Sequence, residues 1–192
     1  MVWKLSSELN GRDLMHIPKG FCQIIFGMGC FWGAERKFWG INGVSATAVG
    51  YSGGNTSNPT YEEVCTGKTG HAEAVKITYD DNEISLDRLL EIFFKTHDPT
   101  TFNRQGNDIG TQYRSAIFYE NENELKFFED YINKLNESNS FSSKIVTSLE
   151  KKSHFYDAEE YHHNYFEKNP LNGYCNMVVR PKVEKFRKEN KQ

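Results

Sequence analysis

The sequence predicts an α+β fold in a single domain, with a mostly antiparallel sheet and helices on one face. Three observations lead to this prediction: the order of strand-like and helix-like patterns, a length of 192 residues, and an aromatic-rich composition. A chain of this length can bury one sizeable core, whereas two domains would be cramped. Its 14 Phe, 10 Tyr and 3 Trp exceed what a disordered chain carries, so we expect it to fold.

The first elements alternate between strand and helix. Residues 1–20 show no periodic pattern and are expected to form an irregular arm. Residues 21–26 are an apolar run typical of a buried strand, and the glycines that follow predict a turn. Apolar residues recur at helical spacing over residues 30–39. Small and β-branched residues then predict a strand over 44–51, before a polar loop over 52–59.

The same types of element recur in the middle of the chain. A short helix is expected over residues 61–65 and a strand over 72–79. Ser85 can cap an amphipathic helix that an Asp-Pro pair stops. A polar loop over 100–111 then leads to a strand over 113–119.

Two further helices are predicted after residue 120. Asn121 opens one of them, with Glu124 as its capping-box partner, and Asp157 with Glu160 repeats that signature before residues 161–166. The core elements therefore run strand, helix, strand, strand, helix, strand. This β-α-β-β-α-β order is that of the split βαβ, ferredoxin-like fold.

Charge and cysteine spacing exclude several kinds of partner and site. A net charge of −3, from 26 acidic and 23 basic residues, gives no field suited to nucleic acid or an anionic membrane. No apolar window reaches the length of a membrane helix, and the N-terminus lacks the pattern of a secretory signal, so we expect a cytoplasmic protein with reduced thiols. The four cysteines form no C-x-x-C pair, which argues against a structural zinc site.

Cys30 is the strongest candidate nucleophile. It follows Gly29 at a predicted strand-to-helix turn, where free backbone N–H groups and the helix dipole favour an anion and predict a lowered thiol pKa. Phe31 and Trp32 place two large aromatic rings beside the sulfur. A lone cysteine is more often a buried core residue, but its Gly-Cys-Phe-Trp-Gly setting favours a reactive thiol.

Glu73 is the second candidate, on the basis of strand parity. It shares one face of its predicted strand with Val75, Ile77 and Tyr79. An ionised carboxyl on an apolar face is costly, so the pKa of Glu73 would rise and the group could act as a general acid near neutral pH. Alternatively, Glu73 lies at the end of the strand and reaches water; parity alone favours neither reading.

Several other residues are weaker indications of function when each is taken alone. Tyr61 and Tyr113 could be packing residues, and Asp108 could make a turn. His71 could be a base for Cys30 or an ordinary structural histidine. With Asp108 as its orienting partner it would make a cysteine hydrolase or acyltransferase, and the aromatic residues alone could form a binding cage.

The remaining cysteines and a histidine pair differ in their expected surroundings. Cys175 lies in a turn-rich segment near a mobile end, where an exposed thiol could resolve an oxidised intermediate. Cys22 and Cys65 are expected in the core. His162 and His163 are expected on the surface of a helix.

Motifs along most of the chain resemble those of the peptide methionine sulfoxide reductases of type A. The run Gly29-Cys-Phe-Trp-Gly-Ala-Glu35 resembles the signature of that family. Further similar segments are Gly50-Tyr-Ser-Gly-Gly54, Asn58-Pro-Thr-Tyr-Glu-Glu-Val64, Thr69-Gly-His-Ala-Glu-Ala-Val75 and Gly106-Asn-Asp-Ile-Gly-Thr-Gln-Tyr-Arg-Ser115. The resemblance implies reduction of methionine-S-sulfoxide, free or in oxidised proteins, and thus protein repair.

The resemblance also implies a role for each candidate in the first half-reaction. Cys30 would attack the sulfoxide sulfur while Glu73 protonates the oxygen, assisted by hydrogen bonds from Tyr61 and Tyr113. Three further residues would bind the substrate. Phe31 and Trp32, which follow the nucleophile, would receive the S-methyl group, and Asp108, a loop carboxylate, would orient the substrate.

Regeneration is implied by the same resemblance. Cys175 would attack the sulfenic acid left on Cys30, and thioredoxin or a small dithiol would reduce the disulfide without a cofactor or metal. No cysteine follows Cys175, so a three-cysteine relay is not expected. We expect a monomer, because no self-complementary exposed stripe is evident. The domain is divided into an arm (1–20), an α+β core (21–150) and a C-terminal segment with the resolving cysteine (151–192).

Overall fold

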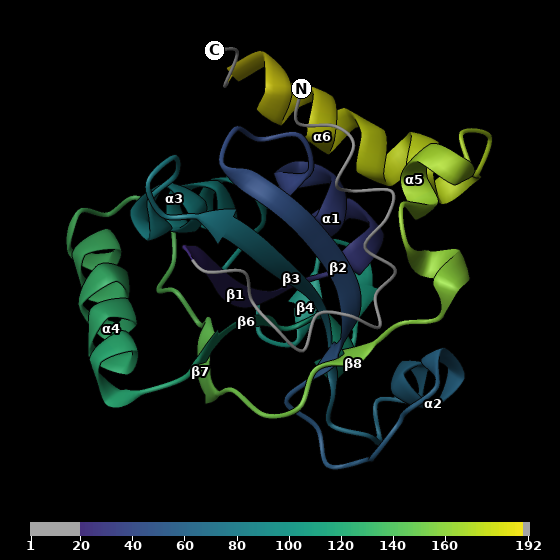
Figure 1. Cartoon of the computed structure of the whole chain (residues 1–192), viewed down its shortest axis with the longest axis horizontal. Coiled ribbons are helices and arrows are strands. Elements are labelled where there is room, and N and C mark those ends of the chain that lie inside the picture. The colour runs from purple at the N-terminus through teal and green to yellow at the C-terminus, as the bar shows by residue number, and fades with distance from the viewer. Residues whose placement is uncertain (1–19, 190–192) are drawn as a thin grey trace.

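A six-stranded sheet forms the centre of the computed structural model, which describes residues 20–189 (Figure 1). The strands lie in the order β7-β6-β1-β3-β2-β8, and each pairing is antiparallel except the parallel pair β6–β7. Their bounds are Phe21–Met28 (β1), Val44–Ser52 (β2), Ala72–Asp80 (β3), Ser115–Tyr119 (β6), Ser148–Lys151 (β7) and Tyr156–Asp157 (β8). The predicted α+β class is confirmed. The edge strands β7 and β8 extend the sheet beyond the four predicted core strands.

The helices agree with the predicted positions over most of the chain. They are Phe31–Phe38 (α1), Tyr61–Cys65 (α2), Leu86–Thr96 (α3), Glu122–Glu137 (α4), Tyr165–Lys168 (α5) and Arg180–Glu189 (α6). The side chain of Ser85 accepts a hydrogen bond from the amide of Arg88, and that of Asn121 accepts from the amide of Glu124. Ser85 and Asn121 therefore cap their helices as the sequence indicates. The Glu124 side chain accepts from the Glu120 amide instead of closing the predicted capping box on Asn121. Asp157 lies in β8, and the turn Glu160–His162 has no side-chain cap, so the capping signature predicted there is wrong.

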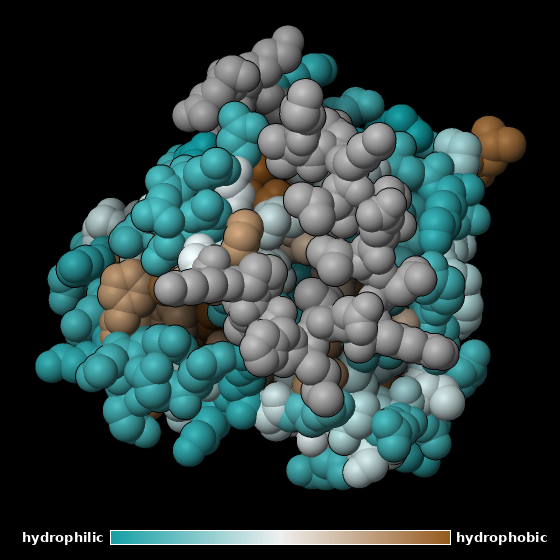
Figure 2. All heavy atoms as spheres, in the orientation of Figure 1, coloured by the Kyte–Doolittle hydropathy of each residue, from teal (hydrophilic) through white to brown (hydrophobic). Residues whose placement is uncertain are grey.

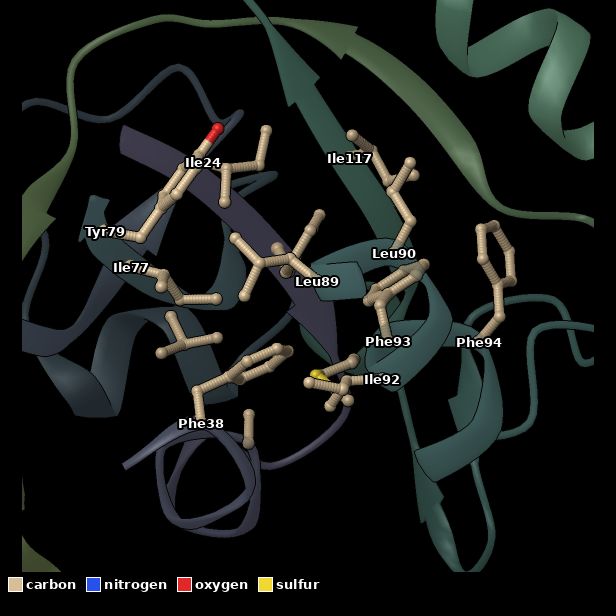
Figure 3. Close-up of a cluster of buried hydrophobic side chains, with 14 of the residues drawn as sticks. Ile24, Phe38, Ile77, Tyr79, Leu89, Leu90, Ile92, Phe93, Phe94 and Ile117 are labelled. Carbon is tan, nitrogen blue, oxygen red and sulfur yellow. The ribbon is translucent and has the colours of Figure 1, made fainter. Parts of the chain in front are cut away.

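The main core lies between the sheet and helices α1, α3 and α4 (Figure 3). Leu89, Leu90 and Phe93 of α3 are fully buried there, and the rings of Phe26 and Phe93 stack with their centroids 4.6 Å apart. Figure 2 shows hydrophilic residues over α2 and α4, with apolar atoms in the seam between α3 and α4. Among the described residues no helix is long and apolar enough to cross a membrane.

Four predicted boundaries differ from the structure. β1 continues through Gly27, which pairs with Ala74 and Ala116, so the turn begins only at Gly29. β6 starts two residues later than predicted, because Tyr113 belongs to the 3₁₀ turn Thr111–Tyr113. The remaining differences are the short hairpin Arg104–Gln105 (β4) and Asp108–Ile109 (β5) within the predicted polar loop, and the break of the predicted helix over 161–166.

That break is at Asn164, which adopts a left-handed conformation with φ of 54°. It separates a 3₁₀ turn, Glu160–His162, from α5. An α-helix cannot continue through a left-handed residue, so two short elements replace one helix. The predicted arm over residues 1–20 lies outside the described part of the chain, except for Gly20.

Candidate active site

Cys30 lies between β1 and α1, as the N-cap residue of the helix. The preceding Gly29 has φ of 84°, a conformation that a residue with a Cβ rarely adopts. A Cβ at Gly29 would also lie 2.6 Å from Cγ of Gln105. The glycine therefore fixes the tight turn that presents the thiol at the helix start.

The predicted lowering of the Cys30 pKa is wrong. Burial raises its pKa well above the usual value, and the nearby Glu73 carboxylate raises it further. Hydrogen bonds from the Trp32 amide and the Tyr174 hydroxyl favour the thiolate, but they do not outweigh these two effects. Part of the Cys30 residue reaches solvent, whereas its sulfur is enclosed by these neighbours. The repulsion from Glu73 acts only while that carboxyl is ionised.

Glu73 is buried beside Cys30, which is one of the two outcomes that strand parity left open. Its residue is only 1% exposed, and Oε2 accepts a hydrogen bond of 3.0 Å from the Phe31 amide. Desolvation raises the pKa of Glu73 to about 8, even though that hydrogen bond favours the ionised form. The alternative in which Glu73 reaches water is excluded. At neutral pH the carboxyl is mostly protonated and can donate.

Two phenols share the surroundings of Glu73. Burial raises the pKa of both Tyr61 and Tyr113, and the charge of Glu73 is the next largest cause for each. Both hydroxyls are therefore protonated hydrogen-bond donors at neutral pH. The ring of Tyr61 stacks with that of Phe31 at a centroid distance of 6.3 Å. The structure thus brings together the predicted acid, both phenols and the nucleophile.

Trp32 is held by a histidine and a tyrosine of the C-terminal segment. Its Nε1 donates a 3.0 Å hydrogen bond to Nδ1 of His162, and its ring stacks on Tyr165 at 3.8 Å with an interplanar angle of 7°. The predicted surface position of His162 is wrong, because the 3₁₀ turn buries it completely against Phe31 and Tyr61. Burial lowers the pKa of His162, so its ring is neutral at physiological pH.

Glu159 fixes the position of Tyr61 from the same turn. One carboxylate oxygen accepts from the Tyr61 amide at 2.9 Å, and the other accepts from the Tyr51 hydroxyl at 2.8 Å. Burial alone would raise the pKa of Glu159, but these hydrogen bonds bring it below the usual value. Glu159 was not among the predicted site residues, because no periodic pattern marks this turn in the sequence.

Asp108 and Tyr174 form the side of the site nearest the C-terminal segment. The Tyr174 hydroxyl donates to Oδ2 of Asp108 at 2.5 Å and also contacts the Cys30 thiol. Burial raises the pKa of Tyr174, followed by the effect of a charged Cys30. Tyr174 was not among the predicted site residues. Its place directly before Cys175 was the available signal.

His71 has a structural role in the loop after β2. Its Nδ1 accepts from the Gly54 amide at 3.0 Å, and its Nε2 lies 2.7 Å from the carbonyl oxygen of Thr56. With Nδ1 acting as an acceptor, Nε2 carries the proton and donates it to that carbonyl. Neither nitrogen is available to Cys30, which contradicts the hydrolase alternative.

The other cysteines lie in surroundings different from those predicted. Cys175 is fully buried and packs with Phe166, Val179 and Val183, so its predicted exposure is wrong. Cys65 is exposed at the end of α2 rather than in the core. Cys22 is only partly buried against the core. All four thiols are free, and residues 20–189 contain no cluster of three or more potential metal ligands.

The π-helical turn Cys175–Val179 explains the burial of Cys175. The Cys175 amide donates to Oδ1 of Asn172 at 3.1 Å, which anchors the start of the turn. The thiol then lies among apolar side chains, while the preceding Tyr174 faces Cys30. The neighbouring residues Tyr174 and Cys175 therefore lie in different surroundings.

Comparisons with known proteins identify the family of the chain. Residues 22–192 match the family described as peptide methionine sulfoxide reductase. Peptide methionine sulfoxide reductase MsrA from Picrophilus torridus is 54% identical over 161 residues, covering 84% of this chain and 90% of the relative.

Two solved structures of Mxr1 from Saccharomyces cerevisiae are also similar. The reduced form has a TM-score of 0.76 at 37% identity, covering 82% of this chain and 91% of that one. Mxr1 in complex with Trx2 has a TM-score of 0.56 at 26% identity, covering 79% and 91%. The chain thus belongs to the peptide methionine sulfoxide reductase family, within type A, and is an oxidoreductase that reduces methionine sulfoxide.

Proposed function

We propose that the chain reduces methionine-S-sulfoxide with Cys30 as nucleophile and Glu73 as general acid. The observation that carries this proposal is the buried Glu73 carboxyl, whose pKa of about 8 keeps it protonated at neutral pH beside the thiol. Sulfoxide oxygen accepts hydrogen bonds well but leaves poorly, so its departure needs a positioned proton donor. Hydroxyl groups of Tyr61 and Tyr113 add two further donors to the developing charge on oxygen.

The first half-reaction transfers the oxygen to the enzyme. Sγ of Cys30 bonds to the sulfoxide sulfur as Glu73 gives a proton to the oxygen. The S–O bond then breaks and leaves a sulfonium whose sulfur is bonded to Sγ of Cys30. The released hydroxide bonds to Sγ as the bond between Sγ and the substrate sulfur breaks, so methionine leaves with that electron pair and Cys30 is left as a sulfenic acid. The thiol proton of Cys30 restores the proton on Glu73, so that the substrate is reduced by two electrons and Cys30 is oxidised by two.

Substrate orientation is assigned to the aromatic rings of Phe31 and Trp32 and to Asp108. The rings of Phe31 and Trp32, 6.5 Å apart, provide apolar faces for the S-methyl group. The contacts of Trp32 with His162 and Tyr165 support this assignment, because they hold the indole ring in one orientation. Asp108, next to Tyr174 and the thiol, would accept a hydrogen bond from the substrate backbone.

Regeneration is assigned to Cys175 followed by thioredoxin. The Cys175 thiol would displace hydroxide from the Cys30 sulfenic acid as water, forming a disulfide that a reduced dithiol then opens. Because Cys175 is buried, the turn Cys175–Val179 has to open first. The structure of yeast Mxr1 in complex with Trx2 supports a thioredoxin as the reductant. We also propose that the chain acts as a cytoplasmic monomer without a metal or organic cofactor.

The test uses each methionine sulfoxide epimer with dithiothreitol and then with thioredoxin. We expect only the S epimer to be consumed, and no consumption by Cys30→Ser. Cys175→Ser should fail only under thioredoxin recycling. If Cys175→Ser recycles normally, another thiol performs the resolving step. If the wild-type chain consumes the R epimer instead, the proposed stereochemistry is wrong.

A further inference from the structure

The short helix α2 depends on other parts of the chain for its position. It has five residues, Tyr61–Cys65, and a helix of that length is not stable by itself in water. In Figure 1 it lies at the lower right, apart from the other helices. Glu159 holds its N-terminal end by accepting from the Tyr61 amide at 2.9 Å. The position of the Tyr61 hydroxyl therefore also depends on what holds the other end.

The C-terminal end of α2 is held by the 3₁₀ turn that precedes β6. The last carbonyl oxygens of a helix have no partner within the helix itself. Nε2 of Gln112 donates to the carbonyl oxygen of Cys65 at 3.3 Å. Oγ1 of Thr111 donates to the carbonyl oxygen of Gly67, also at 3.3 Å. Two consecutive side chains of the turn therefore hold the backbone at the end of α2.

The Tyr61 hydroxyl lies at this same end of the helix. Residues 61 and 65 are four positions apart, so they share one face of α2. The Tyr61 hydroxyl contacts the Cys65 thiol. The hydrogen bond from Gln112 therefore anchors the backbone of the residue beside which the hydroxyl lies.

The turn is itself fixed to the sheet. The guanidinium of Arg114 donates to the carbonyl oxygen of Thr111 at 2.9 Å. The same guanidinium forms a bidentate pair with Glu150 of β7, with distances of 2.7 and 2.9 Å. Tyr113 directly precedes Arg114, so these contacts and β6 hold it without Gln112. The turn is thus a fixed support, and α2 is the element that needs the tie.

The amide group of Gln112 is kept in surroundings that do not favour stability. The residue is 5% exposed, and its Oε1 is buried with no hydrogen-bond partner among the residues that the structure describes. A buried acceptor without a partner is destabilising. Gly110 has φ of 148°, and a Cβ there would lie 2.3 Å from that Oε1, so the glycine leaves room for the amide. What Nε2 holds explains this arrangement better than stability does.

We propose that Gln112, assisted by Thr111, is a positioning residue for the reduction of methionine sulfoxide. It ties α2 to the turn that the sheet supports, so that the Tyr61 hydroxyl stays where it can donate to the sulfoxide oxygen. The inference rests on the donor role that the proposed function gives to Tyr61. Because that hydrogen bond strengthens as charge develops on the oxygen, loss of the tie should slow the chemical step and leave substrate affinity nearly unchanged.

The experiment measures methionine formation in a single turnover over a range of methionine-S-sulfoxide concentrations. Gln112→Met keeps the length of the side chain and removes both polar atoms. Gln23→Met is the matched control, because the amide of Gln23 on β1 also donates one side-chain hydrogen bond, at 3.1 Å to Thr78. Thr111→Val removes the second donor of the turn, and Thr111→Ser keeps it. Thermal unfolding of each variant is measured alongside.

Gln112→Met should lower the maximal single-turnover rate roughly three- to tenfold, with little change in the half-saturating concentration. Its Tm should stay within a few degrees of wild type, because removal of the unpaired Oε1 offsets the lost hydrogen bond. Thr111→Val should slow the reaction in the same way. Thr111→Ser and Gln23→Met should react at the wild-type rate.

Two further backgrounds separate positioning of Tyr61 from a general structural role. In Tyr61→Phe, adding Gln112→Met should cause less than about twofold further loss, since no hydroxyl remains to be positioned. In Tyr113→Phe, the loss from Gln112→Met should remain roughly three- to tenfold, because the sheet holds Tyr113. A general structural role would give the same loss in both backgrounds, and that result would overturn the proposal.

The rate of Tyr61→Phe alone distinguishes this inference from the proposed function. If Tyr61→Phe is slow and Gln112→Met is as fast as wild type, the inference is wrong and the donor role of Tyr61 stands. If Tyr61→Phe is itself as fast as wild type, the donor role in the proposed function is wrong, and the inference fails with it.

Discussion

The two halves of the site are built from different kinds of structure. Cys30 and Glu73 lie at the end of β1 and on β3, two central strands paired over seven residues. His162, Glu159 and Cys175 belong to short 3₁₀ and π-helical turns of the C-terminal segment, held mainly by side-chain contacts. The comparison indicates that the proposed nucleophile and acid are held rigidly, whereas the proposed resolving thiol lies in a segment that can open at lower cost.

The largest expected effect comes from removing the acidic proton of Glu73, in the half of the site that the central strands form. Glu73→Gln keeps the shape and can still accept from the Phe31 amide, but it cannot donate an acidic proton. We expect the rate of methionine formation in a single turnover to fall roughly 10²–10⁴-fold. Rapid-quench measurement checks this, and a loss below about threefold would show that Glu73 is not the acid.

The same carboxyl should also limit stability at alkaline pH. The pKa of Glu73 is raised to about 8 in the folded chain from 4.5, so the folded state binds more protons between these values. Stability from this group is complete below about pH 4.5 and is lost as pH rises through 8. Glu73→Gln should therefore raise Tm relative to wild type at pH 9 by several degrees, and by less at pH 5. An equal difference at both pH values would contradict the buried ionisation.

A smaller effect is expected where the two halves meet, at Trp32. His162→Phe removes the acceptor of the indole hydrogen bond, which costs about 1 kcal/mol, or about fivefold. If the role is to position Trp32, the change should appear mainly in KM, and His162→Gln, whose amide oxygen can accept from the indole, should restore most of it. His154→Phe, a change at an exposed histidine, is the control. A loss in kcat that Gln does not rescue would argue against positioning.

The smallest effect is expected from loosening the C-terminal cluster. Val183 is 3% exposed and packs in the cluster that buries Cys175. Val183→Ala should weaken that cluster by about 1 kcal/mol and raise the labelling rate of Cys175 by a thiol reagent about fivefold. Cys30 labelling should not change in parallel. Equal acceleration at both cysteines would mean that the two halves open together.

The sequence predicted the rigid half better than the C-terminal half for a physical reason. In a central strand the side chains alternate, so parity placed Glu73 on the same face as Val75, Ile77 and Tyr79, although it left open whether the carboxyl reaches water. The 3₁₀ turn of His162 and the π-helical turn of Cys175 have no such period. Their burial depends on tertiary contacts, so Glu159 was not predicted and His162 and Cys175 were expected on the surface.

The pKa of Cys30 shows the same limit of local reasoning. The helix start favours an anion, and the Trp32 amide does contact the sulfur. Burial and the charge of Glu73 are tertiary effects, and they reverse the direction of the shift. The proposed residue roles follow from motifs, whereas the direction of the Cys30 pKa shift depends on the fold.

The most direct test of the central claim is the pH dependence of the single-turnover rate with methionine-S-sulfoxide. If the protonated Glu73 carboxyl drives oxygen departure, the wild-type rate should fall above pH 8, by about tenfold per pH unit. The rate of Glu73→Gln should show no such fall above pH 8. A fall in rate near pH 8 that persists in Glu73→Gln would contradict the account, because another group would then supply the proton.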